Sequence, residues 1–221
     1  MKNTITELVF ILDKSGSMSR LERDTIGGFN STIENHKNNE GTTYVTTVLF
    51  SQNTKTIHDR VLISEIAPMT EEDYCAYGGT ALLDAIGKTI NHFETIHKYG
   101  RAEDIPDNTI FVITTDGEEN SSTIYNSEEI KAKITEKQEK DGWKFLFLGA
   151  NIDSFRTASK IGISHVANFE HTSRGVQASH KTIDYAISRA MCSNLSFDDI
   201  NWQAVMDKFE KEEEHSNGGT K

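Results

Sequence analysis

A carboxylate and two hydroxyls follow a short apolar run near the start of the chain. Residues 8–12 are all apolar, and they are followed by Asp13, then by Ser15 and Ser17 on either side of Gly16. Glycine lets the backbone turn so that both hydroxyls can face the same way. Mg²⁺ prefers oxygen ligands and commonly binds one or two carboxylates together with other oxygens and water. We therefore predict that Asp13, Ser15 and Ser17 form part of a metal site.

Two further segments of the chain carry the same chemistry. The predicted strand 109–115, whose centre 110–113 is fully apolar, is followed by Asp116, and Thr80 follows two glycines at the predicted start of a helix. Glycine amides and the positive end of the helix dipole would surround the Thr80 hydroxyl. In open α/β sheets, ligands bind beyond the carboxyl ends of the strands. We expect residues 13–17, Thr80 and Asp116 to converge at that edge.

The elements that must position these residues follow from the apolar pattern. A run of five apolar residues without alternation is too short for a helix and indicates a strand buried on both faces. The predicted strands are 8–12, 43–51, 54–61, 109–115, 143–148 and 163–169, and the intervening and following segments have helical patterns. The 54–61 run is more polar and is predicted to be an antiparallel edge strand. The fold class is therefore α/β, with a doubly wound, mostly parallel six-stranded sheet, one antiparallel edge strand and helices on both faces.

Two local predictions concern the first helix. Ser19 and Glu22 are spaced as in a capping box, which predicts a helix start at Ser19. Gly27 and Gly28 lie inside this helix, where each glycine costs about 1 kcal/mol relative to alanine. Their presence predicts close backbone packing at that point.

Length and composition limit the domain organisation and the partners. The 221 residues fit one domain, predicted to span 1–195, with a C-terminal helix at 196–212 and a disordered tail at 213–221. The 23 basic and 34 acidic residues give a net charge of −11. Nucleic-acid binding depends on clustered lysine and arginine, so this balance argues against a nucleic-acid partner.

Cysteine content and apolar runs bear on location. Cys75 and Cys192 belong to no metal or redox motif, so we expect ordinary small apolar residues in a reducing compartment. No signal peptide is recognisable before the first strand, and no apolar run approaches the roughly 18 residues of a membrane helix. A cytoplasmic, soluble protein without a membrane partner is expected.

The three oxygen-bearing segments together resemble a known motif. Asp13-Lys-Ser-Gly-Ser17, Thr80 in Gly-Gly-Thr-Ala-Leu, and Asp116 in Thr-Thr-Asp-Gly are similar to the metal-ion-dependent adhesion site of von Willebrand factor type A domains. The resemblance covers nearly the whole chain, and the segments agree in order, spacing and strand context. The stretch 145–153 and the segment beginning at Gly175 also resemble small intracellular bacterial or phage members of this family.

The resemblance implies a divalent ion at the top of the sheet. Ser15, Ser17 and Thr80 would bind the ion, and Asp13 and Asp116 would bind it directly or through water. The implied ion is Mg²⁺, with Mn²⁺ or Ca²⁺ as alternatives. A glutamate or aspartate from a protein partner would complete the coordination, and the chain would then be an interaction module rather than an enzyme.

Two other functions are carried as alternatives. By analogy with intracellular members of the family, the chain could be a subunit of an ATPase-associated or a stress- or phage-related complex. A phosphoryl-transfer enzyme of haloacid-dehalogenase type also has an aspartate after its first strand. That class needs a second acid two residues later, where this chain has Ser15, and we expect no such activity.

Several other polar residues have two interpretations. Asp84 is either a supporting residue of the metal site or a solvated surface acid. Glu118 and Glu119 are either charges at the rim of the site or part of an ordinary acidic loop. Asp153 is interpreted as a helix cap, and with Asn151 it could instead border the same crevice. The apolar stripe 202–209 is predicted to pack on the domain, with a partner-helix site as the alternative.

Overall fold

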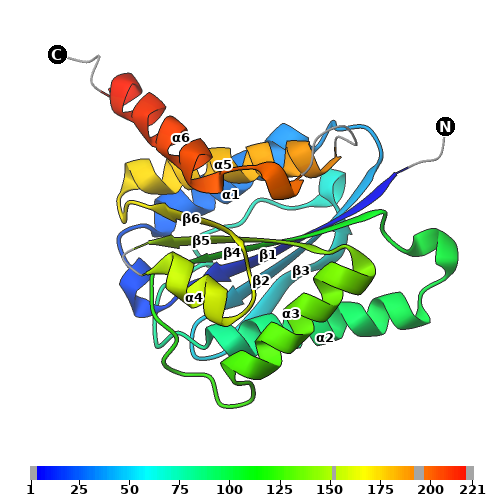
Figure 1. Cartoon of the computed structure of the whole chain (residues 1–221). Helices are drawn as coiled ribbons and strands as arrows, with labels where there is room; N and C mark the ends of the chain where they lie inside the picture. Colours follow the sequence, from blue (N-terminus) through cyan, green and yellow to red (C-terminus); the bar gives the residue numbers. More distant parts are fainter. Residues whose placement is uncertain (1–3, 151–152, 192–196, 218–221) are drawn as a thin grey trace.

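A six-stranded sheet lies at the centre of the computed structural model, which describes residues 4–150, 153–191 and 197–217 (Figure 1). The strand order is β3-β2-β1-β4-β5-β6, and only the β2–β3 pairing is antiparallel. The strands are β1 (Ile5–Asp13), β2 (Thr42–Phe50), β3 (Thr54–Leu62), β4 (Asn108–Thr115), β5 (Lys144–Ala150) and β6 (His165–Phe169). The predicted fold class, including the antiparallel edge strand, is confirmed.

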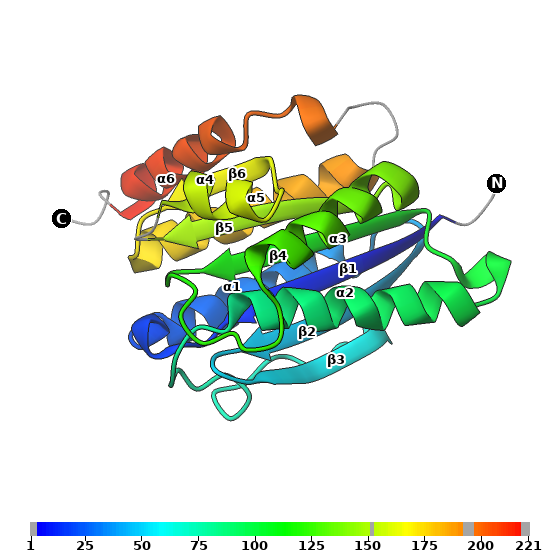
Figure 2. The same cartoon turned by 60° about the horizontal axis from the view of Figure 1, so that its bottom comes forward.

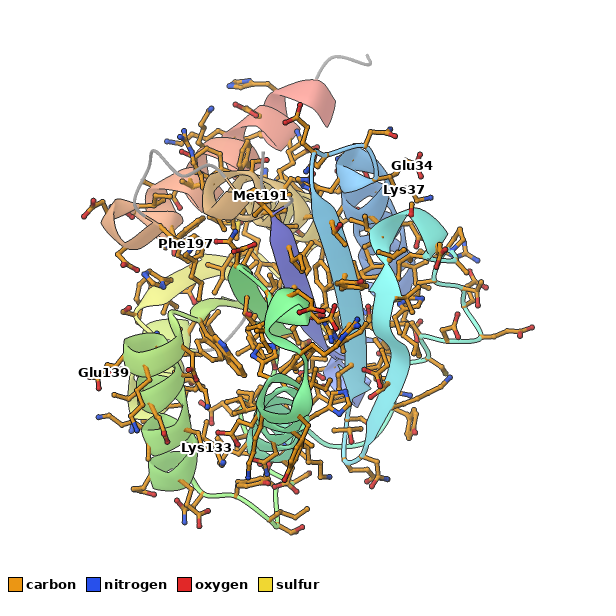
Figure 3. All side chains as sticks on the ribbon, turned by 90° about the vertical axis from the view of Figure 1, so that its right-hand side faces the viewer. Glu34, Lys37, Lys133, Glu139, Met191 and Phe197 are labelled. Carbon is orange, nitrogen blue, oxygen red and sulfur yellow. The ribbon has the colours of Figure 1, made fainter. Side chains whose placement is uncertain are left out.

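Helices cover both faces of this sheet. On one face lie α1 (Glu22–His36), α5 (Ser173–Met191) and α6 (Trp202–Asn217), and on the other lie α2 (Leu82–Tyr99), α3 (Ser127–Asp141) and α4 (Ser154–Lys160) (Figure 2). The end-on view in Figure 3 places Lys133 of α3 and Glu34 of α1 on opposite sides of the sheet. The result is a three-layer arrangement of helices, sheet and helices.

Strand β1 occupies the middle of the sheet and contributes to both cores. Leu8, Phe10 and Leu12 pack with the α1–α5–α6 layer, whereas Val9 and Ile11 pack with the α2–α3–α4 layer. Each of these side chains is at most 1% exposed. Alternate residues of a strand point to opposite faces. Because both faces of β1 are covered by helices, every residue of the run 8–12 has to be apolar.

The winding of the chain reverses beside β1. From β1 the chain adds β2 and β3 on one side, and it then returns to add β4, β5 and β6 on the other. In the β1–β4 pairing Leu12 lies opposite Thr114, so Asp13 and Asp116 are at adjacent strand ends. This is the crevice in which α/β sheets of this kind bind ligands.

The start of α1 differs from the predicted capping box. The helix begins at Glu22 after Leu21, and Ser19 makes no capping bond. Arg20 has a φ of 97°, which redirects the chain between Ser19 and the helix. The Glu22 carboxylate instead accepts a hydrogen bond from the Ala76 N–H at 2.8 Å.

The C-terminal helix is longer than predicted. α6 continues to Asn217, so residues 213–217 are helical, and 218–221 lie outside the described residues. Glu213 is buried and its carboxylate lies 2.6 Å from the Lys181 ammonium of α5, which holds this charged segment against the domain. Trp202 and Met206 are buried in the core, as predicted for the apolar stripe.

The structure bears on the predictions about membrane helices and about the two cysteines. None of the helices that the structure describes has the length and apolar character needed to cross a bilayer. Cys75 is exposed rather than packed as an apolar residue, because it lies in the loop before α2. Cys192 lies outside the described residues.

The predicted close packing in α1 occurs at one of its two glycines. A Cβ at Gly28 would lie 2.0 Å from Cδ2 of His180 in α5, whereas a Cβ at Gly27 would meet nothing within 4 Å. His180 is buried, and burial lowers its pKa to about 4, so the ring is neutral at pH 7. The α1–α5 contact therefore needs a residue without a side chain at position 28.

This difference between neighbouring glycines predicts opposite effects of alanine. Gly28→Ala should lower the free energy of unfolding by about 1–3 kcal/mol, because it overpacks a filled contact. Gly27→Ala should raise it by about 0.5–1 kcal/mol, because alanine favours the helix and meets no neighbour. Urea denaturation of both variants measures the two changes. Equal effects would show that His180 does not restrict position 28.

Candidate functional site

Backbone hydrogen bonds join the loop after β1 to the loop before α2. The Gly16 N–H donates to the Gly78 carbonyl at 3.0 Å, and the Tyr77 N–H donates to the Lys14 carbonyl at 2.9 Å. Gly78 has a φ of 78°, in the left-handed region that glycine adopts readily. These bonds bring the serines of one loop beside Thr80 of the other.

The loop after β4 is tied to the same place. Asn120 accepts a hydrogen bond from the Thr80 N–H at 2.9 Å and donates its own N–H to the Thr80 carbonyl at 3.0 Å. A Cβ at Gly117 would lie 2.9 Å from Thr80 Oγ1 and 3.6 Å from Ser17 Oγ. Both hydroxyls therefore lie against Gly117, and a side chain there would crowd them. Thr80 precedes α2, which begins at Leu82, so it is not the helix start that the sequence predicted.

The hydroxyls and Asp116 form a continuous set of contacts. Ser15 Oγ lies 3.1 Å from Ser17 Oγ, and Ser17 Oγ donates to Asp116 Oδ1 at 2.6 Å. Asp13, Ser15, Thr80 and Asp116 are buried, whereas Ser17 is exposed. The site therefore opens to solvent at Ser17.

Asp13 is held by hydrogen bonds on both carboxylate oxygens. Oδ1 accepts from the Ser15 N–H at 2.7 Å, and Oδ2 accepts from the Thr115 hydroxyl at 2.5 Å. The Tyr74 hydroxyl donates to the Asp13 carbonyl. Burial raises the pKa of Asp13 to about 6, and the bonds from Thr115 and Ser15 oppose this change. A cation close to this carboxylate would stabilise its charged form.

Asp116 has one oxygen that its neighbours leave unsatisfied. Its side chain is 1% exposed, and Oδ2 is buried without a hydrogen-bond partner. His171 Nε2 lies 2.7 Å from this oxygen, but the two atoms are not aligned as a hydrogen bond. A buried carboxylate oxygen without a donor carries a desolvation cost that a bound cation would offset.

His171 was not identified as a site residue from the sequence. It follows β6, the last parallel strand, at the carboxyl end of the sheet. A histidine just after a predicted parallel strand was the available signal, because such positions share the edge where Asp13 and Asp116 lie.

The residues present suit a hard divalent cation. In the described part of the chain, no cluster of three or more His, Cys, Asp or Glu residues is arranged to hold a metal. The predicted site instead combines two carboxylates with three hydroxyls, which are ligands of the kind that Mg²⁺ accepts. The structure brings all five predicted residues to one edge of the sheet, and their role as metal ligands stays a prediction.

The sequence left Asp84 as either a supporting residue of the metal site or a solvated surface acid, and the structure shows that it binds backbone N–H groups of a neighbouring loop. Its carboxylate accepts backbone N–H bonds from Thr123, Ile124 and Tyr125 at 3.1, 3.0 and 3.0 Å. Burial favours the neutral form, but these three bonds prevail and hold the pKa of Asp84 below its usual value. Asp84 is therefore a buried anchor for the loop that leads into α3.

In the acidic loop after Asp116, Glu119 forms hydrogen bonds that hold the structure together. Glu119 accepts a hydrogen bond from the Leu83 N–H, in the first turn of α2, at 2.9 Å. It also accepts one from the Ser122 N–H of its own loop at 2.7 Å. Glu118 is exposed. Asp153 accepts from the Arg156 N–H at 3.0 Å and caps α4, as predicted. Asn151 lies outside the described residues.

Comparison with known proteins supports the fold but reaches no close relative. No protein-family model and no curated protein sequence matches the chain. A von Willebrand factor type A structure from Catenulispora acidiphila has a TM-score of 0.58 at 13% identity, and the match covers 85% of this chain and 43% of that one. The chain thus spans less than half of that protein.

Two further structures are matched over nearly their whole length. The vWF domain of the type V pili tip protein Mfa5 from Porphyromonas gingivalis has a TM-score of 0.55 at 9% identity, covering 87% of this chain and 99% of that one. The hypothetical protein BatB from Bacteroides thetaiotaomicron has a TM-score of 0.52 at 14% identity, covering 84% and 98%. The chain therefore has a von Willebrand factor type A fold.

The anchoring of the loop by Asp84 yields a test. Asp84→Asn should lower the free energy of unfolding by about 1.5–3 kcal/mol, because an amide NH₂ would face a backbone N–H donor in place of a charged acceptor. Glu118→Gln, an equal change of charge at an exposed position, should change it by less than about 0.5 kcal/mol. Chemical denaturation compares the two variants. Similar losses would mean that net charge, rather than the three backbone bonds, controls stability here.

Proposed function

We propose that this protein is an interaction module that binds a partner through a divalent cation. Asp13, Ser15, Ser17, Thr80 and Asp116 would hold the ion, directly or through water. The observation that supports this most is the buried Oδ2 of Asp116, which has no hydrogen-bond partner and belongs to a set of hydroxyls and carboxylates that opens to solvent at Ser17.

The charges of the site favour an additional anionic ligand. Two carboxylates balance the charge of one divalent ion, and the hydroxyls add no further negative charge. The ion would keep its attraction for an anion, and Mg²⁺ needs roughly six oxygen ligands, some of which are usually exchangeable waters. We infer that a glutamate or aspartate of the partner takes one of these positions. Mg²⁺ is the proposed ion, with Mn²⁺ and Ca²⁺ as alternatives.

An aromatic side chain beside the opening offers contact area to a partner. Tyr77 is 48% exposed, and its ring lies 4.5 Å from the buried Lys14 ammonium. Both residues belong to the two loops that form the site. Exposed tyrosines with restricted side chains are common in protein interfaces.

Wider aspects of this function are hypotheses that follow from the family resemblance. A cytoplasmic location, a bacterial or phage origin and membership of an ATPase-associated or stress-related complex belong to this group. The phosphoryl-transfer alternative has less support, because position 15 is a serine whose N–H binds Asp13.

The metal site itself is tested by removing two hydroxyls. Ser15→Ala combined with Ser17→Ala should abolish binding of Mg²⁺ and Mn²⁺ in titration calorimetry, with an unchanged circular dichroism spectrum. Ser19→Ala combined with Ser31→Ala removes two exposed hydroxyls elsewhere and should leave binding unchanged. Binding that survives in the Ser15/Ser17 double variant would contradict the assigned ligands.

The adhesive role requires a separate experiment. Partner proteins retained on the immobilised chain with Mg²⁺ should be released by a chelator, identified by mass spectrometry, and not retained by the Ser15/Ser17 double variant. Replacing one glutamate or aspartate of such a partner by its amide should abolish retention, because the ion would lose its anionic ligand. Partners that stay bound in chelator, or that tolerate every such replacement, would contradict a metal bridge.

A further inference from the structure

The histidine–aspartate contacts in the described part of the chain differ in whether they form a hydrogen bond. His92 Nε2 and Asp59 Oδ1 lie 2.8 Å apart and form a hydrogen bond at the surface. His171 Nε2 and Asp116 Oδ2 lie only 2.7 Å apart, yet neither atom has a hydrogen-bond partner. His36 Nε2 and Asp184 Oδ1 also lack one, but they are farther apart, at 3.4 Å. Distance alone therefore does not explain why the His171–Asp116 pair lacks a hydrogen bond.

Two ligands of one metal ion would produce such a contact. Metal–nitrogen and metal–oxygen bonds of about 2.0–2.1 Å at roughly right angles place neighbouring ligand atoms about 3 Å apart. The lone pairs of both atoms then point at the ion rather than at each other. The contact between His171 Nε2 and Asp116 Oδ2, at 2.7 Å and without a hydrogen bond, is compatible with this arrangement.

The backbone around His171 is held before any ligand binds. The Thr172 N–H donates to the Glu170 carbonyl at 2.7 Å, and Thr172 Oγ1 accepts from the Gly175 N–H at 3.1 Å. A Cβ at Gly175 would lie 1.9 Å from the Glu170 oxygen, so this turn excludes any side chain there. A fixed backbone positions the imidazole with little loss of entropy on binding.

Neighbouring helices also anchor this turn. The Glu170 N–H donates to the Glu210 carboxylate of α6 at 2.9 Å, and the Ser173 hydroxyl donates to the Asp24 carboxylate of α1 at 2.6 Å. His171 itself is 23% exposed in its side chain, so its ring lies partly within the site rather than free in solvent.

We propose that His171 Nε2 is a direct ligand of the metal ion, beside Asp116, and that the site prefers Mn²⁺ to Mg²⁺. This inference rests on the proposed metal site, and it replaces Mg²⁺ by Mn²⁺ as the preferred ion. Imidazole nitrogen binds first-row transition metals well, whereas Mg²⁺ favours oxygen. The nitrogen ligand gives this site a selectivity that carboxylates and hydroxyls alone would not provide.

Titration calorimetry of the full chain with MnCl₂ and with MgCl₂ tests the selectivity. His171→Ala should weaken Mn²⁺ binding by about 10–100-fold and Mg²⁺ binding by less than about threefold, because water can replace the ring for Mg²⁺. His92→Ala removes the comparable surface pair and should change neither. Equal losses for both ions would overturn the proposed preference.

A spectroscopic measurement identifies the ligand atom. Pulsed electron paramagnetic resonance of the Mn²⁺-loaded wild-type chain should show coupling to a ¹⁴N nucleus that is absent in His171→Ala. Bound Mn²⁺ without nitrogen coupling would overturn the role of His171 and leave the oxygen site intact. Failure of the wild type to bind either ion would overturn the proposed function as well.

Discussion

Two buried carboxylates at adjacent strand ends are the constraint on which the site depends. Asp13 and Asp116 lie where β1 and β4 end, and both are almost fully removed from water. Like charges in such a place destabilise one another unless donors or a cation compensate. Asp13 has donors on both oxygens, whereas Asp116 has a donor on one only. The imbalance at Asp116 makes this end of the sheet receptive to a cation.

The scaffold around these carboxylates consists mainly of backbone hydrogen bonds. Three loops that are distant in the sequence are joined by hydrogen bonds from the main-chain N–H groups of Gly16, Tyr77 and Asn120. Asp84 and Glu119 extend this bonding into the loop before α3. Since main-chain bonds contribute much of what holds these loops, Asp116 Oδ2 is left without a hydrogen-bond partner. Such preorganisation reduces the ordering that binding would require.

His171 lies beside the predicted metal site of a fold that this chain shares with other proteins. Matches at 9–14% identity show that this chain shares its strands and helices with von Willebrand factor type A domains, but not that it shares their loops. The tight turn at Gly175 directs one imidazole toward Asp116. The proposed ligand set therefore includes a residue from the loop after β6, in addition to residues from the loops after β1 and β4 and from the loop before α2. The strands position these loops, and the loops carry the proposed ligands.

The sequence alone determined the sheet and the oxygen-bearing residues, because apolar runs of strand length and the residues that follow them are local signals. The predicted strands and the convergence of Asp13, Ser15, Ser17, Thr80 and Asp116 follow from that pattern and from the geometry of parallel sheets. Only the tertiary structure decided three other features: His171 at Asp116, the helical course of α6 past Glu213, and the start of α1 at Glu22 instead of Ser19. The first two depend on contacts between residues far apart in the chain, and the third accompanies a positive φ at Arg20, a residue type that seldom adopts this conformation. No local pattern of apolar and polar residues encodes such contacts.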